Sequence, residues 1–78
     1  MNEKELQFRK VLGFNIKVER ARKNITQETL AEMAGISTKH VTKIENAGVT
    51  PNIYFIYKIA QALDVTIDEL TTEYKRSR

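Results

Sequence analysis

Residues Thr26 to Asn46, TQETLAEMAGISTKHVTKIEN, contain two short helical patterns separated by Gly35. Thr26 is typical of the N-cap of the first helix, and Ser37 of the N-cap of the second. Gly35 suits the left-handed residue that ends the first helix. Neither helix is long enough to be stable alone in water. The stretch therefore predicts a packed pair of helices joined by a tight turn and supported by the rest of the chain.

Helical patterns also flank this pair. One helix is expected from about Glu3 to Lys23. The residues that share one face of it are Phe8, Arg9, Leu12, Ile16 and Arg20. Asn52 is expected to cap a fourth helix, whose apolar stripe comprises Ile53, Ile56, Ile59, Ala60 and Leu63. Thr66 and Glu69 form a capping box for a short fifth helix that carries Ile67 and Leu70. The predicted fold is all-helical, with five helices and short connections.

The length of 78 residues predicts a single domain, residues 1–78, with a narrow margin of stability. We expect residues 1–11 to extend the first helix and residues 75–78 to form a basic tail. Cysteine is absent, which excludes disulfides and thiolate metal sites. The longest apolar run, Ile53–Tyr57, is far too short to span a membrane, and the N-terminus has no apolar signal region. We expect a cytoplasmic protein.

The composition gives no basis for an enzyme. The chain has two serines, one histidine and no glycine-rich phosphate loop, so neither a nucleophile with its base nor a nucleotide site can be assembled. We expect no catalytic residue, cofactor, metal or small-molecule ligand. Residues 1–25 hold seven Lys and Arg against three Glu. This excess suits a polyanionic partner, although a solvated surface would explain the charge equally well.

The third helix has two different faces. Val41 and Ile44 point one way, and the opposite face carries Thr38, Lys39, Thr42, Lys43 and Asn46. A face of small polar and cationic groups without a carboxylate suits the DNA major groove, where such side chains reach base edges and phosphates. In the second helix, Ala31 is small enough to allow a close crossing by the third.

The spacing of these residues resembles the Cro and phage-repressor type of helix-turn-helix regulators, also called Xre-like. The matching residues are Gln27, Leu30, Ala31, Ala34, Gly35, Ile36, Val41, Ile44, Glu45, Asn46, Pro51 and the stretch KIAQALDV from Lys58 to Val65. The resemblance covers about Leu12 to Leu70. It implies a compact five-helix, lambda-repressor-like DNA-binding domain in which the second and third helices form the helix-turn-helix.

The resemblance also implies roles for individual residues. Base contacts are expected from Thr38, Lys39, Thr42 and Lys43. Phosphate contacts are expected from Gln27, Thr26, His40 and Asn46. Arg20 and Glu45 match an ion pair between the first and third helices, and the helical period places both on facing edges. The family often has glycine where Ala47 stands, followed by further basic residues, so this loop departs from the pattern.

Aromatic residues at the start of the fourth helix lie outside its predicted stripe. Tyr54 and Phe55 would expose a large ring in a monomer. In the resembling repressors the matching positions, with those at Ile67 to Glu69, form a two-fold contact, so Tyr54, Phe55 and Ile67 are the expected homodimer interface. The alternative is that residues Tyr74–Arg78 fold over Phe55.

A second apolar stripe on the first helix has three candidate partners. It comprises Val11, Phe14 and Val18, and the N-terminal extension, the fifth helix or another subunit would cover it. The sequence does not choose among these partners.

These observations lead to one main reading and two alternatives. The main reading is a transcriptional regulator, a repressor or autoregulator, that binds double-stranded DNA sequence-specifically as a homodimer, with Thr38–Asn46 in the major groove. The first alternative is an antitoxin or other protein-interaction module in which DNA binding is secondary. The second is an adaptor that keeps the fold without binding DNA, and the carboxylate-free face of the third helix argues against it.

Overall fold

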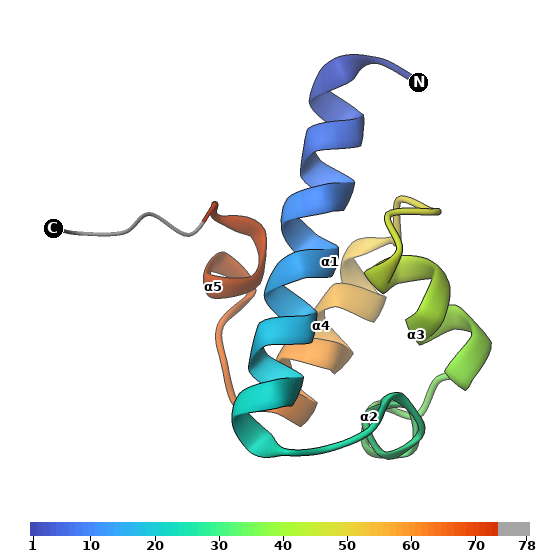
Figure 1. Ribbon diagram of the computed structural model, residues 1–78, viewed down its shortest axis with the longest axis vertical. Helices are drawn as coiled ribbons and strands as arrows, with labels where there is room; N and C mark the ends of the chain where they lie inside the picture. Colours follow the sequence, from blue (N-terminus) through green and yellow to red (C-terminus); the bar gives the residue numbers. More distant parts are fainter. Residues whose placement is uncertain (74–78) are drawn as a thin grey trace, which may run out of the picture.

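The computed structural model describes residues 1–73 and is all-helical within that range (Figure 1). The helices are α1 (Glu3–Lys23), α2 (Gln27–Ala34), α3 (Thr38–Glu45), α4 (Ile53–Leu63) and α5 (Ile67–Thr71). The predicted five-helix fold is therefore confirmed. The predicted basic tail at 75–78, and the segment Tyr74–Arg78 that was a candidate cover for Phe55, lie outside the described residues.

Each helix begins at a side chain that caps it. The side-chain oxygens of Asn2, Thr26, Ser37, Asn52 and Thr66 each accept a hydrogen bond from the backbone N–H three residues further on. The Thr66–Glu69 capping box has both of its reciprocal hydrogen bonds. Gly35 ends α2 with a φ of 72°, in the left-handed region. The caps predicted from the sequence are thus confirmed, and each satisfies a backbone donor that the first turn of a helix leaves free.

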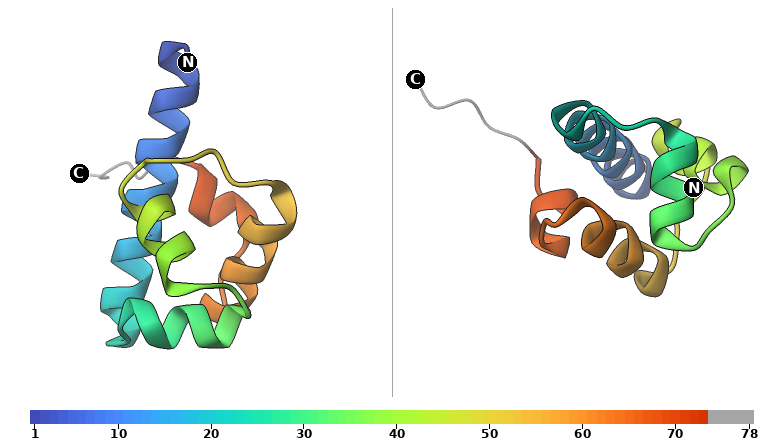
Figure 2. Two further views of the ribbon diagram at one scale, coloured as in Figure 1. Left: turned by 90° about the vertical axis from the view of Figure 1, so that its right-hand side faces the viewer. Right: turned by 90° about the horizontal axis from the view of Figure 1, so that it is seen from below.

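The helix α1 runs through the middle of the molecule. Figure 1 shows α2 and α3 on one side of it, α5 on the other and α4 behind it, and α1 contacts α3, α4 and α5. The N-terminal turns of α1 extend beyond the rest of the molecule, and α3 lies close to α2 (Figure 2). This arrangement places α3 at the surface, with its inner side supported by both α1 and α2.

The core draws on all five helices. It consists of Leu12, Ile16, Leu30, Ala31, Ala34, Val41, Ile44, Ile56, Ile59, Ala60, Leu63 and Leu70. Ile53, which the sequence placed in the apolar stripe of the fourth helix, does not join this core with the rest of the stripe, because the residue is 64% exposed. Ile53 is the first residue of α4 and lies on the same face as Ile56, one turn earlier. The apolar stripe of α4 begins before the part of the helix that the neighbouring helices cover. No helix among residues 1–73 is long and apolar enough to cross a membrane.

Gly13 allows α1 and α3 to cross at backbone contact. A Cβ atom at this position would lie 2.6 Å from the backbone oxygen of Glu45 and 2.8 Å from that of Ile44. Any larger residue would therefore push the two helices apart. A glycine inside a helical pattern is a recognised signal of close approach, so the sequence carried a signal of this crossing that the predictions above did not use.

Asn15 fastens α5 to α1. Its side chain is buried, and its Nδ2 group donates to the backbone oxygens of Leu70 and Thr72, both at 2.9 Å, and to that of Glu69 at 3.3 Å. These carbonyls lie at the C-terminal end of α5, where a helix has no partners of its own. The amide therefore satisfies the end of a helix that is too short to be stable alone.

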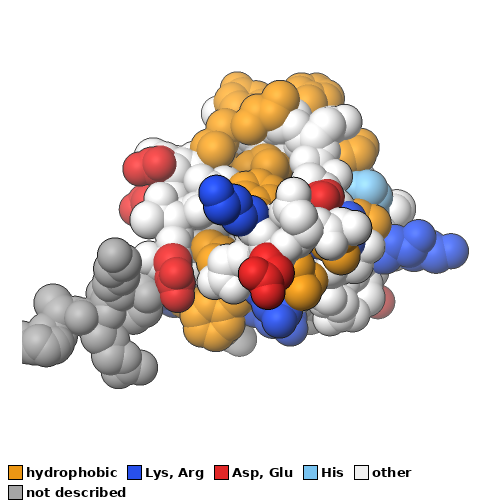
Figure 3. Space-filling view, turned by 90° about the horizontal axis from the view of Figure 1, so that it is seen from above, with side chains coloured by type: hydrophobic (Ala, Val, Ile, Leu, Met, Phe, Trp, Pro, Cys, Tyr) orange, Lys and Arg blue, Asp and Glu red, His pale blue; other side chains and the backbone are white. Residues whose placement is uncertain are grey.

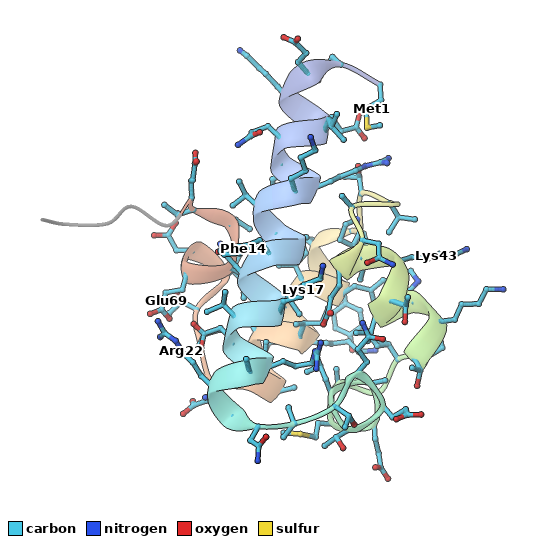
Figure 4. All side chains as sticks on the ribbon, in the orientation of Figure 1. Met1, Phe14, Lys17, Arg22, Lys43 and Glu69 are labelled. Atoms are coloured by element: carbon cyan, nitrogen blue, oxygen red, sulfur yellow. The ribbon has the colours of Figure 1, made fainter. Side chains whose placement is uncertain are left out.

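Phe14, the middle residue of the second apolar stripe of α1, lies on the side where α5 packs (Figure 4). Val11 and Val18 are half-buried, whereas Phe14 remains 57% exposed. Of the three partners that the sequence left open, α5 lies beside the stripe, but it does not cover the Phe14 ring.

The extension of α1 holds the loop that follows α3. Thr50 Oγ1 donates to Glu5 Oε2 at 2.5 Å and accepts from Arg9 Nε at 2.7 Å. The hydrogen bond from Thr50, together with the nearby Arg9 guanidinium, lowers the pKa of Glu5 from its usual value. A lowered carboxyl pKa means that this contact stabilises the fold at neutral pH and is lost as the pH falls through the pKa of the folded state.

Candidate nucleic-acid interface

The two faces of α3 differ as the helical period predicts. Val41, Ile44 and Glu45 are buried, and Lys39 and Lys43 are exposed. Figure 4 shows Lys43 pointing away from the body of the molecule. Glu45 is the only carboxylate of α3 and faces inward, so the exposed face of this helix carries no negative side chain.

A polar cluster around the buried Glu45 carboxylate, which we define as Arg20, Gln27, Thr42 and Glu45, joins α3 to α1 and α2. Arg20 Nε donates to Glu45 Oε2 at 2.7 Å, and Arg20 Nη2 donates to Glu45 Oε1 at 3.1 Å. The Glu45 side chain is 0% exposed and that of Arg20 is 21% exposed. Paired with this carboxylate, the Arg20 guanidinium has a raised pKa. The fork geometry fixes the angle of α3 because a bidentate pair holds both side chains in one orientation.

Gln27 completes the cluster from the start of α2. Its Nε2 group donates to Glu45 Oε1 at 2.9 Å, and its Oε1 atom accepts from Thr42 Oγ1 at 2.8 Å. The sequence analysis expected this amide to face a DNA phosphate, but both of its polar atoms have partners within the protein. Thr42, expected to contact a base, is likewise tied to Gln27 and to the backbone oxygen of Thr38.

His40 packs against Phe55 and does not project into solvent. The ring centroids lie 4.6 Å apart in an edge-to-face arrangement. The expectation that Phe55 is an exposed ring is therefore wrong, because α3 half-covers it. Nε2 of His40 is buried without a hydrogen-bond partner among the described residues. The predicted phosphate contact of His40 cannot use that atom unless the ring moves.

The remaining predicted contact residues lie at the two ends of the helix pair. Thr26 is exposed, but its hydroxyl already caps α2 by accepting from Thr29 N–H at 3.0 Å. Thr38 is half-buried at the start of α3, and Asn46 is exposed at its end. Ala47 then takes a φ of 60°, a left-handed conformation that glycine adopts without strain.

The outer side of α4 carries an exposed apolar face, which we define as Ile53, Tyr54 and Tyr57 together with Met33 of α2. Figure 3 shows hydrophobic side chains gathered on the side of the molecule where α4 lies. Tyr54 and Tyr57 stack with ring centroids 6.4 Å apart. The predicted exposure of Tyr54 is confirmed at 60%.

Lys58 links this apolar face to the helix pair. Its Nζ lies 4.9 Å from the centroid of the Tyr54 ring and 5.3 Å from that of Phe55. The same ammonium group donates to the backbone oxygen of Gly35 at 3.3 Å, at the C-terminal end of α2. A single lysine therefore contacts two aromatic rings of α4 and the turn between α2 and α3.

Ile67, the third expected interface residue, is half-buried against the core. It borders a shallow groove between α4 and α5 that is lined by Tyr57, Ala60, Gln61, Val65, Thr66 and Ile67. Tyr57 therefore belongs both to this groove and to the exposed apolar face of α4. The sequence analysis did not single out Tyr57, although its spacing of three residues from Tyr54 on a helix was the available signal.

Comparison with known proteins agrees with this geometry. A helix-turn-helix family model matches residues 16–70, from within α1 to the core residue Leu70 of α5. The chain belongs to this helix-turn-helix family, as the resemblance implied. It is 33% identical over 67 residues to the uncharacterized HTH-type transcriptional regulator y4dJ of Sinorhizobium fredii, and the match covers 86% of this chain and 87% of that protein.

Two solved structures share the fold at similar identity. The hypothetical transcription factor NHTF from Neisseria is 30% identical with a TM-score of 0.84, over 88% of this chain and 79% of that one. The restriction-modification controller protein C.AhdI from Aeromonas hydrophila is 31% identical with a TM-score of 0.77, over 80% and 94% of the two chains. The chain thus has the fold of helix-turn-helix transcriptional regulators.

Proposed function

We propose that this protein binds double-stranded DNA sequence-specifically as a homodimer, with α3 in the major groove, and controls transcription as a repressor or autoregulator. The observation that carries the proposal is the exposed face of α3, where Lys39 and Lys43 project and no carboxylate is present. Ammonium groups at these positions can reach the O6 and N7 acceptors of guanine. The relatives named as transcription regulators support the same reading.

Lys43 is our first choice for a base-reading residue. Replacing Lys43 by alanine should cost about 1 to 3 kcal/mol of binding free energy on the preferred site and relax the preference at one base pair. Arg22→Ala is the control, because it removes one positive charge from the side of α1 away from α3 (Figure 4). The preferred site is first selected from random duplexes. The affinity of each variant is then measured at several salt concentrations, both for that site and for each single-base change in it. Equal losses for Lys43→Ala on every sequence would leave α3 as a phosphate-binding surface.

The dimer interface is proposed on the apolar face of α4. Four large apolar side chains are exposed there, which is unusual for a surface with no partner. Tyr54→Glu should produce a monomer in sedimentation and reduce tight operator binding, because two half-sites are no longer bound together. Gln7→Glu adds the same charge on the exposed side of α1 and should remain dimeric. If Tyr54→Glu remains dimeric, the interface lies elsewhere, and Phe14 is the next candidate.

The same apolar face also supports a second candidate function. A different protein could cover Ile53, Tyr54 and Tyr57, as in an antitoxin whose main partner is a toxin. Purification from the native host distinguishes the two, since an antitoxin should carry a stoichiometric second protein. Recovery of the chain alone as a dimer would exclude this alternative.

A further inference from the structure

The hydroxyl of Thr42 lies between two hydrogen-bond acceptors. Thr42 Oγ1 is 2.8 Å from Gln27 Oε1 and 3.1 Å from the backbone oxygen of Thr38. A hydroxyl has one proton, and neither of these neighbours has a proton to offer. The Thr42 proton must therefore point into the protein, toward one or both of them.

Glu45 determines which end of the Gln27 amide faces Thr42. An ionised carboxylate only accepts hydrogen bonds, and Glu45 Oε1 lies 2.9 Å from Gln27 Nε2. The reversed amide would place its oxygen against a fully buried carboxylate and its NH₂ group against Thr42. Arg20 keeps the carboxylate in place with hydrogen bonds of 2.7 and 3.1 Å. The charge of Glu45 thus sets the direction of the hydrogen bond from Gln27 to Glu45 and of the hydrogen bond from Thr42 to Gln27.

We infer that Thr42 reads DNA as a hydrogen-bond acceptor and selects a base pair that offers an amino group. This inference rests on the proposed function, since it requires α3 in the major groove. With its proton held by Gln27 and Thr38, the hydroxyl has only lone pairs to offer a base. In the major groove, adenine N6 and cytosine N4 are the amino donors, whereas guanine O6 and N7 are acceptors. Thr42 therefore excludes guanine at the edge it contacts.

Two neighbouring positions of α3 then carry opposite chemistry. The ammonium group of Lys43 can only donate, which favours guanine, and the hydroxyl of Thr42 can only accept, which favours adenine or cytosine. The difference does not follow from residue type alone, because a free threonine hydroxyl donates and accepts equally well. The hydrogen bonds of the polar cluster produce this difference.

The base assignment is tested with Thr42→Val, which keeps the shape and removes the hydroxyl. On the selected site, Thr42→Val should weaken binding about 3- to 10-fold, as expected for one hydrogen bond. If the contacted base is adenine, replacing it by purine removes the amino group alone. On this modified site the wild type should lose affinity by the same factor, about 3- to 10-fold, whereas Thr42→Val should bind it as well as the unmodified site. Thr42→Ser, which keeps the hydroxyl, should retain the preference. A cytosine is tested in the same way with its N4 amino group removed.

Two results would overturn the base assignment. One is a loss of affinity for Thr42→Val that is the same whether or not the bases of the site carry their amino groups. The other is a loss that disappears when guanine is replaced by 7-deazaguanine, because the hydroxyl would then be donating to N7. A wild-type protein that selects no site overturns the proposed function and the base assignment with it.

The chain of hydrogen bonds is tested separately in the free protein by the exchange of hydroxyl protons in NMR spectra. Thr71 is the internal control, since within residues 1–73 its hydroxyl donates to the backbone oxygen of Ile67 alone, at 2.9 Å. The Thr42 proton should exchange with water more slowly than the Thr71 proton, and Gln27→Ala should bring the two rates together. Exchange at Thr42 as fast as at Thr71 in the wild type would overturn the hydrogen-bond chain, whatever the DNA experiments show.

Discussion

The two sides of the α2–α3 pair differ in whether their side chains find partners within the chain. On the side toward α1, the polar cluster of Arg20, Gln27, Thr42 and Glu45 has short hydrogen bonds that link all four residues. On the side toward α4, the apolar face of Ile53, Tyr54, Tyr57 and Met33 remains exposed. The hydrogen bonds of the first region are formed within one chain, whereas the second region leaves large apolar side chains that no other part of residues 1–73 covers.

This difference separates stability from association. A buried charge that loses its partner has no access to water, so changes in the polar cluster should lower the free energy of unfolding of the monomer. An exposed apolar side chain contributes little to the monomer, so changes on the α4 face should act on assembly. The free energy of unfolding of single variants in each region measures this separation.

The largest effect is expected from Arg20→Met. It leaves the Glu45 carboxylate buried without its ion-pair partner, which should cost about 3 to 5 kcal/mol. Glu45→Leu removes the carboxylate instead, and its cost should be smaller because Arg20 is partly exposed. Chemical denaturation of both single variants and the double variant gives the coupling energy. Zero coupling would mean that the pair contributes nothing to stability.

Gly13→Ala should cost about 1 to 3 kcal/mol, since its Cβ would lie 2.6 Å from a backbone oxygen of α3. Alanine is the better helix former by about 1 kcal/mol, so the steric cost must exceed that gain. The pair Gln7→Gly and Gln7→Ala, at an exposed position of the same helix, measures the gain directly. A Gly13→Ala protein more stable than the wild type would show that α1 and α3 can separate freely.

Ala47→Gly should stabilise the protein by about 1 kcal/mol, because it relieves a left-handed alanine after α3. Asn24 and Asp64 have similar φ values of 56° and 57°, but asparagine and aspartate tolerate this conformation better. Thermal unfolding of the three glycine variants should therefore rank Ala47→Gly as the most stabilising. Equal gains at all three positions would contradict strain at Ala47.

The smallest effect is expected from Ile53→Ser on the apolar face. The free energy of unfolding of the monomer should change by less than about 0.5 kcal/mol, because the side chain is 64% exposed. Denaturation is followed at a concentration where sedimentation shows a monomer. A loss near 2 kcal/mol would place Ile53 in the monomer core after all.

Local chemistry explains why so much of the fold was predictable. The caps at Thr26, Ser37 and Asn52 depend on a side chain and a backbone group three residues apart. Left-handed Gly35 also depends only on its own backbone. The exposure of Ile53 was not predictable in this way, because the helical period gives the direction of a side chain but not whether another helix lies there.

The sequence by itself determined the helices, their caps and the two faces of α3, because each depends on residues within one or two turns of each other. It also placed Arg20 and Glu45 on facing edges of two helices. Only the tertiary structure decided that Gly13 lies against the backbone of α3 and that Asn15 holds the end of α5. It also decided that the Gln27 amide lies between Glu45 and Thr42. These contacts join residues distant in sequence, and their geometry depends on how the helices cross, which no local pattern encodes.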